Sequence, residues 1–249
     1  MQLRVTALAL LLLFLSLSYS QEPLKPVGIK ITRPGVVSIA GTPPVGGTLV
    51  SYGYSLDQPA TGAHLQGMST LFEHTLATRV AIYIVTTEPL VRNGNFAWGD
   101  TCPGIKFRLA KETSRRPLLA ISYGIKVPTA SEGFGTGRYD HKINTHADKG
   151  IGRTRFTGNF ATLWAEQKDG HRIRQYTPAL GALTRWHGRW GSALQAYWTT
   201  AGKGYGGLVA APFVQINPNF NLFAGAMRNI GRYNTRYSLI AGFNYMYRK

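Results

Sequence analysis

The C-terminal stretch Tyr237-Ser-Leu-Ile-Ala-Gly-Phe-Asn-Tyr-Met-Tyr-Arg248 alternates between apolar or aromatic residues and small or polar ones. Its odd positions are all apolar or aromatic, whereas Ser238, Gly242 and Asn244 stand among the even positions. Because successive side chains of a β-strand point to opposite faces, this period of two predicts a strand with one apolar face. The same alternation recurs in residues 104–109, 118–126, 153–164, 175–186 and 190–198.

Glycine, proline and polar residues divide the chain into about twelve such segments. We place them near residues 47–56, 66–77, 79–87, 101–112, 116–127, 136–147, 152–165, 172–186, 189–200, 205–217, 219–229 and 235–248. Tight connections such as 77–78, 148–151, 187–188 and 217–218 alternate with longer ones such as 88–100. This layout is typical of outer-membrane barrels. The sequence therefore predicts an all-β fold, a single antiparallel transmembrane β-barrel of about 12 strands.

A soluble barrel or sandwich would turn the apolar face inward, whereas a membrane barrel turns it toward lipid. Aromatic residues separate the two, because Tyr176 and Trp186 stand at opposite ends of one apolar face. Their spacing projects to about 25 Å for a strand tilted by about 40°, which is the height of a lipid-facing band. This favours the membrane barrel, with a soluble exported barrel or sandwich that binds an apolar ligand as the alternative. The predicted aromatic girdle comprises Trp164, Tyr176, Trp186, Trp190, Trp198, Tyr237 and Tyr247.

The N-terminus predicts export. Residues 1–20 contain one cation, an apolar run at 5–17 and small residues where a signal peptidase cleaves, as in a signal peptide. Residues 21–46 are then a periplasmic N-terminal lead-in, and residues 47–249 form the barrel in the bacterial outer membrane. Five prolines make the lead-in irregular, and the barrel lumen is one place where it can lie.

The composition restricts the partners. There are 28 Lys and Arg against 11 Asp and Glu, but these cations are spread over many segments rather than gathered in a nucleic-acid stripe. A single cysteine, Cys102, excludes a disulfide framework and a cysteine-based zinc site. We therefore expect no cofactor, no metal and no nucleic acid. The expected partners are outer-membrane lipid and a small-molecule solute.

The polar face of the strands carries more cations than acids, which leaves two interpretations open. An excess of cations in a narrow lumen would raise the local concentration of anions and favour an anion-selective pore or cavity. Alternatively, the cations pair with acids, asparagines and backbone groups in a structural network, and the pore is closed. The lumen-facing candidates for binding or selectivity are Glu73, Arg79, Lys106, Arg108, Lys126, Asp140, Lys142, Arg153, Arg155 and Arg185.

Catalysis finds little support in the sequence. A hydrolase acting on membrane lipid would need a serine and a histidine side by side on the lipid face. His74 and His141 point outward by parity, but the adjacent segments offer no outward serine near either. The glycine-rich stretches 133–137 and 202–207 are not followed by an apolar helix, so they lack the geometry of a phosphate loop. We expect no catalytic residue and no enzyme.

Four motifs resemble the outer-membrane barrels named for the meta-pathway of phenol degradation. Trp98-Gly-Asp-Thr-Cys-Pro-Gly-Ile-Lys-Phe-Arg-Leu109 is similar to a strand-entry motif of that family, and Ile125-Lys-Val-Pro-Thr129 to a strand end with its loop. Arg138-Tyr-Asp-His-Lys-Ile-Asn144 and Asn217-Pro-Asn-Phe-Asn-Leu222 are similar to later hairpins. The resemblance implies an outer-membrane channel or transporter for small solutes, aromatic ones included. One departure is the C-terminus, which ends in Tyr247-Arg-Lys249 rather than on an aromatic residue.

Overall fold

The computed structural model describes residues 38–59, 65–92, 95–132, 137–166, 170–201, 204–231 and 235–248. The predicted signal peptide and the lead-in as far as residue 37 lie outside these ranges. Within them, no helix is long and apolar enough to cross a membrane.

Twelve long strands and one short strand make up the described regular structure. They are β1 (Thr48–Pro59), β2 (Leu65–Ala77), β3 (Val80–Arg92), β4 (Asn95–Ala97), β5 (Thr101–Ala110), β6 (Leu118–Lys126), β7 (Asp140–Ile151), β8 (Thr154–Glu166), β9 (Arg172–His187), β10 (Trp190–Thr199), β11 (Tyr205–Asn217), β12 (Phe220–Gly231) and β13 (Thr235–Tyr247). The short β4 pairs only with the end of β3, which pairs with β5 over its earlier residues.

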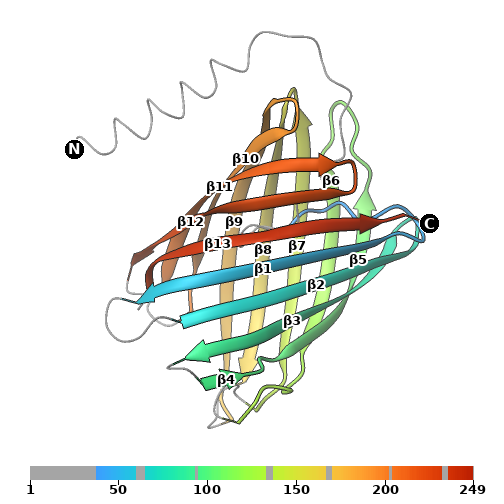
Figure 1. Cartoon of the computed structure of the whole chain (residues 1–249). Coiled ribbons are helices and arrows are strands. Elements are labelled where there is room, and N and C mark those ends of the chain that lie inside the picture. Colours follow the sequence, from blue (N-terminus) through green and yellow to red (C-terminus); the bar gives the residue numbers. More distant parts are fainter. Residues whose placement is uncertain are drawn as a thin grey trace.

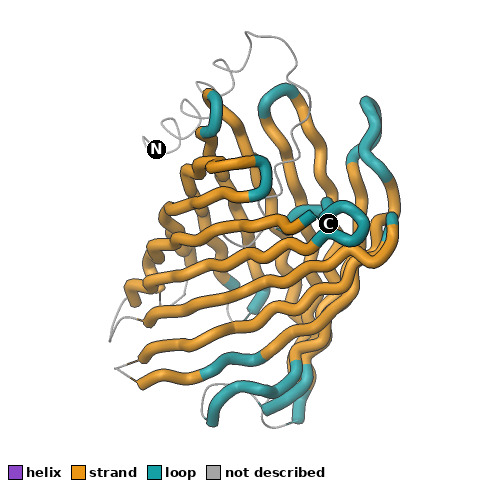
Figure 2. The backbone as a smooth tube through the Cα atoms, turned by 45° about the vertical axis from the view of Figure 1, so that its right-hand side comes forward, coloured by secondary structure: helices purple, strands orange, loops and turns teal. Residues whose placement is uncertain are grey.

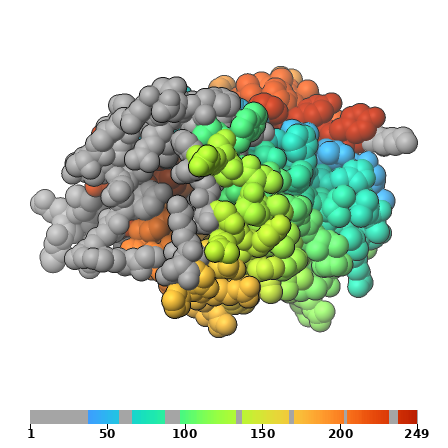
Figure 3. Space-filling model, turned by 90° about the horizontal axis from the view of Figure 1, so that it is seen from below, coloured from blue at the N-terminus to red at the C-terminus, as the bar shows by residue number. Residues whose placement is uncertain are grey.

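The long strands close into a barrel. Each pairs antiparallel with its neighbours along the chain, and β1 pairs with β13 from Thr48 opposite Tyr247 onward. Figure 1 shows β10 to β13 and β1 to β3 crossing in front of β6 to β9, as strands tilted against a barrel axis do. From below, the red C-terminal strands lie beside the blue start of the barrel (Figure 3). The prediction of a closed antiparallel barrel of about 12 strands is confirmed.

The strands end at two rims, which Figure 2 shows as loops and turns joining long runs of strand. Gly152 and Gly188 begin the tight turns after β7 and β9 with φ of 55° and 52°, a conformation that glycine adopts without steric cost. Short turns mark the periplasmic end of outer-membrane barrels, so we call this end the periplasmic rim and the other the loop rim. The predicted turn at 148–151 is wrong, because β7 continues its pairing with β8 as far as Ile151.

Most large outward side chains are apolar, as lipid requires. Exposed large side chains include Ile82, Phe107, Leu180 and Leu239, each on the face opposite the buried residues of its strand. The soluble barrel with an inward apolar face therefore does not fit. Of the predicted girdle, the residues exposed near the periplasmic rim are Trp186, Trp190 and Tyr247, and those exposed toward the loop rim are Tyr176, Trp198 and Tyr237. Trp164 is half-buried on β8 under the guanidinium of Arg174.

Candidate functional site: the barrel lumen

The ten candidates from the sequence do not all reach the lumen wall. Eight lie on strands at positions that share a face with buried residues, and these are Glu73, Lys106, Arg108, Lys126, Asp140, Lys142, Arg155 and Arg185. Arg79 and Arg153 lie instead in the tight turns before β3 and β8. Arg79 is exposed there, and Arg153 donates a hydrogen bond to the backbone oxygen of Trp186. Both were placed in the lumen because the predicted strands began too early.

A buried ion pair joins β2 and β5 on the lumen side of β3, the strand between them. The Lys106 ammonium lies 2.7 Å from a carboxylate oxygen of Glu73, and the two side chains are 5% and 1% exposed. Lys106 also donates to the backbone oxygen of Ile39 at 3.4 Å. A charge so far from solvent is stable only with such partners, so each member of the pair depends on the other.

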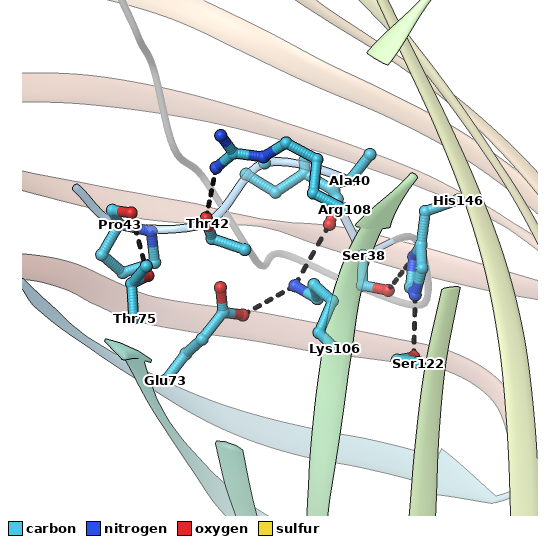
Figure 4. Close-up of polar contacts among 12 residues, drawn as sticks. Ser38, Ala40, Thr42, Pro43, Glu73, Thr75, Lys106, Arg108, Ser122 and His146 are labelled. Atoms are coloured by element: carbon cyan, nitrogen blue, oxygen red, sulfur yellow. Dashed lines mark hydrogen bonds and ion pairs between the residues drawn. The ribbon is translucent and has the colours of Figure 1, made fainter. Parts of the chain in front are cut away.

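Residues 38–47 run through the lumen and are bound to its wall (Figure 4). The Asp148 carboxylate accepts the backbone N–H of Ala40 at 2.9 Å and that of Gly41 at 3.4 Å. Arg108 donates to the Thr42 hydroxyl, and the Thr75 hydroxyl donates to the Pro43 backbone oxygen at 2.9 Å. The segment has no strand partner for most of its backbone, and wall side chains from several strands supply the hydrogen bonds instead.

His146 is the centre of a second group of contacts at the start of this segment. Its Nε2 lies 2.9 Å from the Ser122 hydroxyl, and its Nδ1 lies 3.1 Å from the Ser38 hydroxyl. Asn159 donates its amide to the Ser38 backbone oxygen at 2.6 Å and accepts the Ser38 N–H at 2.9 Å. That double contact fixes the amide orientation, so its NH₂, 3.0 Å from Nδ1, donates to the ring. A neutral His146 then carries its proton on Nε2, facing Ser122.

Further ion pairs satisfy other lumen cations. Lys126 lies 2.6 Å from Asp140 and 3.4 Å from Asp100, and Arg155 lies 3.2 Å from Glu112. Arg185 instead donates to the neutral side chain of Gln215. Lys142 is exposed on the lumen face of β7.

Three acids in these contacts, Asp100, Glu112 and Asp148, were not among the candidates from the sequence. Asp148 shares the parity of Asp140 and Lys142, and it directly follows the predicted segment 136–147, so one further residue would have included it. Asp100 and Glu112 flank β5, outside its regular alternation, and no pattern in the sequence points to their partners.

The lumen therefore has two unlike walls. The polar wall consists of β2 and β5–β8, whose inward side chains hold residues 38–47. The apolar wall consists of β9–β12, where Leu183, Ala193, Phe213 and Phe223 form a cluster of buried side chains. All four lie three or four residues from the periplasmic ends of their strands, which is also where Lys106, Glu73 and Asp148 lie on theirs. At this level, residues 38–47 lie against one side of the lumen and buried apolar side chains line the other.

The described part of the lumen offers no cluster of side chains that could bind a metal ion. Across the described ranges, no three side chains of His, Cys, Asp or Glu come together as metal ligands. The polar groups in contact with residues 38–47 are instead occupied by that segment or by one another.

Comparison with known proteins gives a likeness of fold. No protein-family model matches the chain, and no curated protein sequence matches it. Among solved structures, an outer membrane channel named COG4313 from Pseudomonas putida F1 aligns over 82% of this chain and 96% of its own, with a TM-score of 0.64 and 12% identity. The KdgM porin in complex with oligogalacturonate aligns over 80% and 99% with a TM-score of 0.59 and 6% identity. The NanC porin aligns over 80% and 98% with a TM-score of 0.58 and 9% identity. The chain thus has the fold of outer-membrane channels, and its apolar exterior with aromatic residues toward both rims makes it a β-barrel of the bacterial outer membrane.

Proposed function

We propose that this protein is an outer-membrane channel for small solutes, and that residues 38–47, part of a periplasmic lead-in, form its constriction. The observation that carries the proposal is a closed barrel with an outward apolar face, whose lumen holds a chain segment through side-chain hydrogen bonds. Residues 38–45 can leave without breaking the barrel wall, because side chains hold them and the strand pairing of the wall does not include them. Gly46 and Gly47 keep backbone hydrogen bonds to Thr75 of β2. Passage of solute would follow displacement of this segment.

A weak preference for anions follows from how the lumen charges near the periplasmic rim are matched. Glu73 and Glu112 are engaged by cations, and Asp148 is engaged by backbone N–H groups. Arg108 and Arg185, in contrast, hydrogen-bond to neutral oxygens of Thr42 and Gln215. Their charges therefore still act on ions in the lumen, and a low-dielectric lumen strengthens this effect. The extensive pairing elsewhere keeps the expected preference small.

Hydrolysis is the competing function, because Ser122, His146 and Asn159 lie in a row that resembles a nucleophile, a base and its orienting group. The hydrogen-bond pattern disfavours this. A catalytic base must accept the serine proton, whereas here Nε2 carries a proton toward Ser122 and Asn159 donates to Nδ1. Ser38 also covers the group from the lumen side. We therefore propose a transport role for the lumen rather than a catalytic one.

Membership of the barrels named for the meta-pathway of phenol degradation is part of the proposal, and so is passage of aromatic solutes. Both rest on the motif resemblance in the sequence. Benzoate and acetate test the second point, since they carry the same charge and differ in the aromatic ring. We expect millimolar benzoate, and not acetate, to change the current through an open channel.

The experiment is planar-bilayer recording of the purified protein. We expect small, infrequent openings from the unaltered chain and larger or longer ones from Asp148→Ala, which releases the backbone of Ala40 and Gly41. In a KCl gradient, the reversal potential should indicate anion preference and move toward zero in Arg185→Gln. Arg115→Gln, in an exposed periplasmic turn, is the matched control. Absence of any conductance from all variants would contradict the proposal.

A further inference from the structure

The outer surface of the barrel is hollowed over β9–β12, the orange to red strands of Figure 1. The hollow is an apolar groove of about 670 Å³. Its floor is made by one outward alanine from each strand, namely Ala182, Ala196, Ala210 and Ala226. Phe156, Leu180, Leu194 and Leu208 stand beside them.

The strand register explains how the four alanines together form one groove. Ala210 pairs directly with Ala226 on β12 and with Leu194 on β10, and Ala196 pairs with both Leu180 and Leu208. Leu194 is also the partner of Ala182, so apart from Ala210 and Ala226 the alanines are diagonal neighbours, and the leucines stand between and beside them. Because these positions face outward on a membrane barrel, the groove opens toward lipid.

One cation stands at the edge of this groove. Arg228 lies on the outward face of β12, pairs with Tyr237 of β13, and is exposed three residues before β12 ends at the loop rim. Other outward charged residues have partners. Lys149 donates to the Ser114 backbone oxygen, Glu166 pairs with Arg172, and Arg174 lies over Trp164. Within the described part of the chain, no acidic side chain or hydrogen-bond acceptor is found for Arg228.

A cation on the lipid face is unfavourable unless it reaches the interface and meets an anion there. Arginine does both, because its aliphatic stem can lie along apolar surface while the guanidinium extends toward the headgroups. The guanidinium also matches the oxygens of a phosphate in a bidentate geometry. An acyl chain in the groove and a phosphate on Arg228 therefore satisfy both parts of the site.

We propose that this groove binds a phosphorylated membrane lipid, with one acyl chain on the alanine floor and the phosphate at Arg228. A second copy of the chain is a poorer occupant. A two-fold interface centred on the groove would place the same lining on both sides, and that lining contains no acidic residue to neutralise Arg228. The inference is independent of channel activity, because the groove lies outside the lumen.

The test is native mass spectrometry of the full-length protein in detergent with added phosphatidylglycerol or with diacylglycerol of the same acyl chains, which lacks the phosphate. The unaltered protein should retain phosphatidylglycerol preferentially. Arg228→Gln should lower retention of phosphatidylglycerol at least threefold and leave diacylglycerol unchanged. Ala210→Phe, which fills the floor, should lower retention of both lipids. The matched controls are Ala241→Phe, on the outward face of β13 away from the groove, and Arg115→Gln in a periplasmic turn.

Three results would overturn the proposal. Equal lipid retention in the unaltered protein, Arg228→Gln and Ala210→Phe would show that the groove holds no specific lipid. The loss of a dimer species in Ala210→Phe would assign the groove to a second copy of the chain. A drop in Ala210→Phe alone, with Arg228→Gln behaving as the unaltered protein, would also contradict it, since the headgroup would then be unrecognised.

Discussion

The polar and apolar walls of the lumen share one backbone architecture and differ in what their inward side chains contact. On the polar wall, Lys106 and Asp148 bind groups far away in sequence, including the backbone of residues 38–47. On the apolar wall, Phe213 and Phe223 contact side chains from the neighbouring strands. Both walls consist of strands whose side chains alternate between the lumen and the lipid. Only the polar wall offers hydrogen-bond partners for the N–H and C=O groups of a segment without a strand partner.

The chemistry of the two walls explains why residues 38–47 lie against the polar one. A backbone segment placed against Leu183 or Phe213 would leave its polar groups buried without hydrogen bonds, which costs free energy for each group. Against β2 and β5–β8, the same groups find Asp148, Thr75 and Asn159. The location of residues 38–47 is therefore a consequence of wall chemistry rather than of shape alone.

The largest effect is expected on the polar wall from Lys106→Met. This change leaves the Glu73 carboxylate buried at 1% exposure without its cation. Breaking a buried pair in this way costs about 3–5 kcal/mol of unfolding free energy. Urea unfolding of the protein refolded in vesicles, followed by tryptophan fluorescence, measures the loss.

The double variant Glu73→Gln with Lys106→Met is the control for that experiment. It removes both charges, so most of the lost stability should return. If the double variant were as unstable as Lys106→Met, loss of packing around the lysine rather than an unpaired carboxylate would explain the effect.

The second-largest loss of stability is expected from Gly191→Ala on β10, which tests the packing of the apolar wall. An added Cβ would lie 2.3 Å from the Phe213 ring and 2.5 Å from the backbone oxygen of Thr184. The ring can turn away but the backbone cannot, so overpacking should cost about 2–3 kcal/mol in the same unfolding measurement. Gly53→Ala is the matched control, since its added Cβ would meet only the Ser69 hydroxyl at 3.7 Å. Equal effects of the two substitutions would contradict tight packing on the apolar wall.

The sequence predicted the strands well because their signal is local. The alternation of 237–248 places β13, found at Thr235–Tyr247, and side-chain parity placed Glu73 and Lys106 on the lumen face. What each inward side chain binds depends on residues distant in sequence. The contact between Lys106 and Ile39 spans 67 positions, and no period in the sequence encodes it. The missed Asp148 shows the remaining weakness, since a strand end misplaced by a few residues removes a lumen residue from consideration.

A smaller effect should distinguish the segment from the wall that holds it. Asp148→Ala removes the acceptor for the N–H groups of Ala40 and Gly41 while leaving the strand pairing of β7 intact. Hydrogen bonds to a charged acceptor contribute about 1.5–3 kcal/mol, so a loss of about 2 kcal/mol is expected. Hydrogen exchange should show faster exchange at residues 40 and 41 and unchanged protection in β7. Uniformly faster exchange would instead indicate that the wall itself had loosened.

The smallest effect is expected from Arg155→Gln, which breaks the pair with Glu112 near the periplasmic rim. These side chains are 20% and 27% exposed, so water can solvate the carboxylate once the cation is gone. Glu112 also keeps the Gly150 N–H at 2.7 Å. Such a pair, with an N–O distance of 3.2 Å against 2.7 Å for the buried pair, contributes less than about 1 kcal/mol. The ratio between this loss and that of Lys106→Met is the informative quantity. A similar loss of unfolding free energy in both variants would show that the contribution of these ion pairs depends on charge and not on burial. A several-fold larger loss in Lys106→Met would show that burial makes the Lys106–Glu73 pair indispensable.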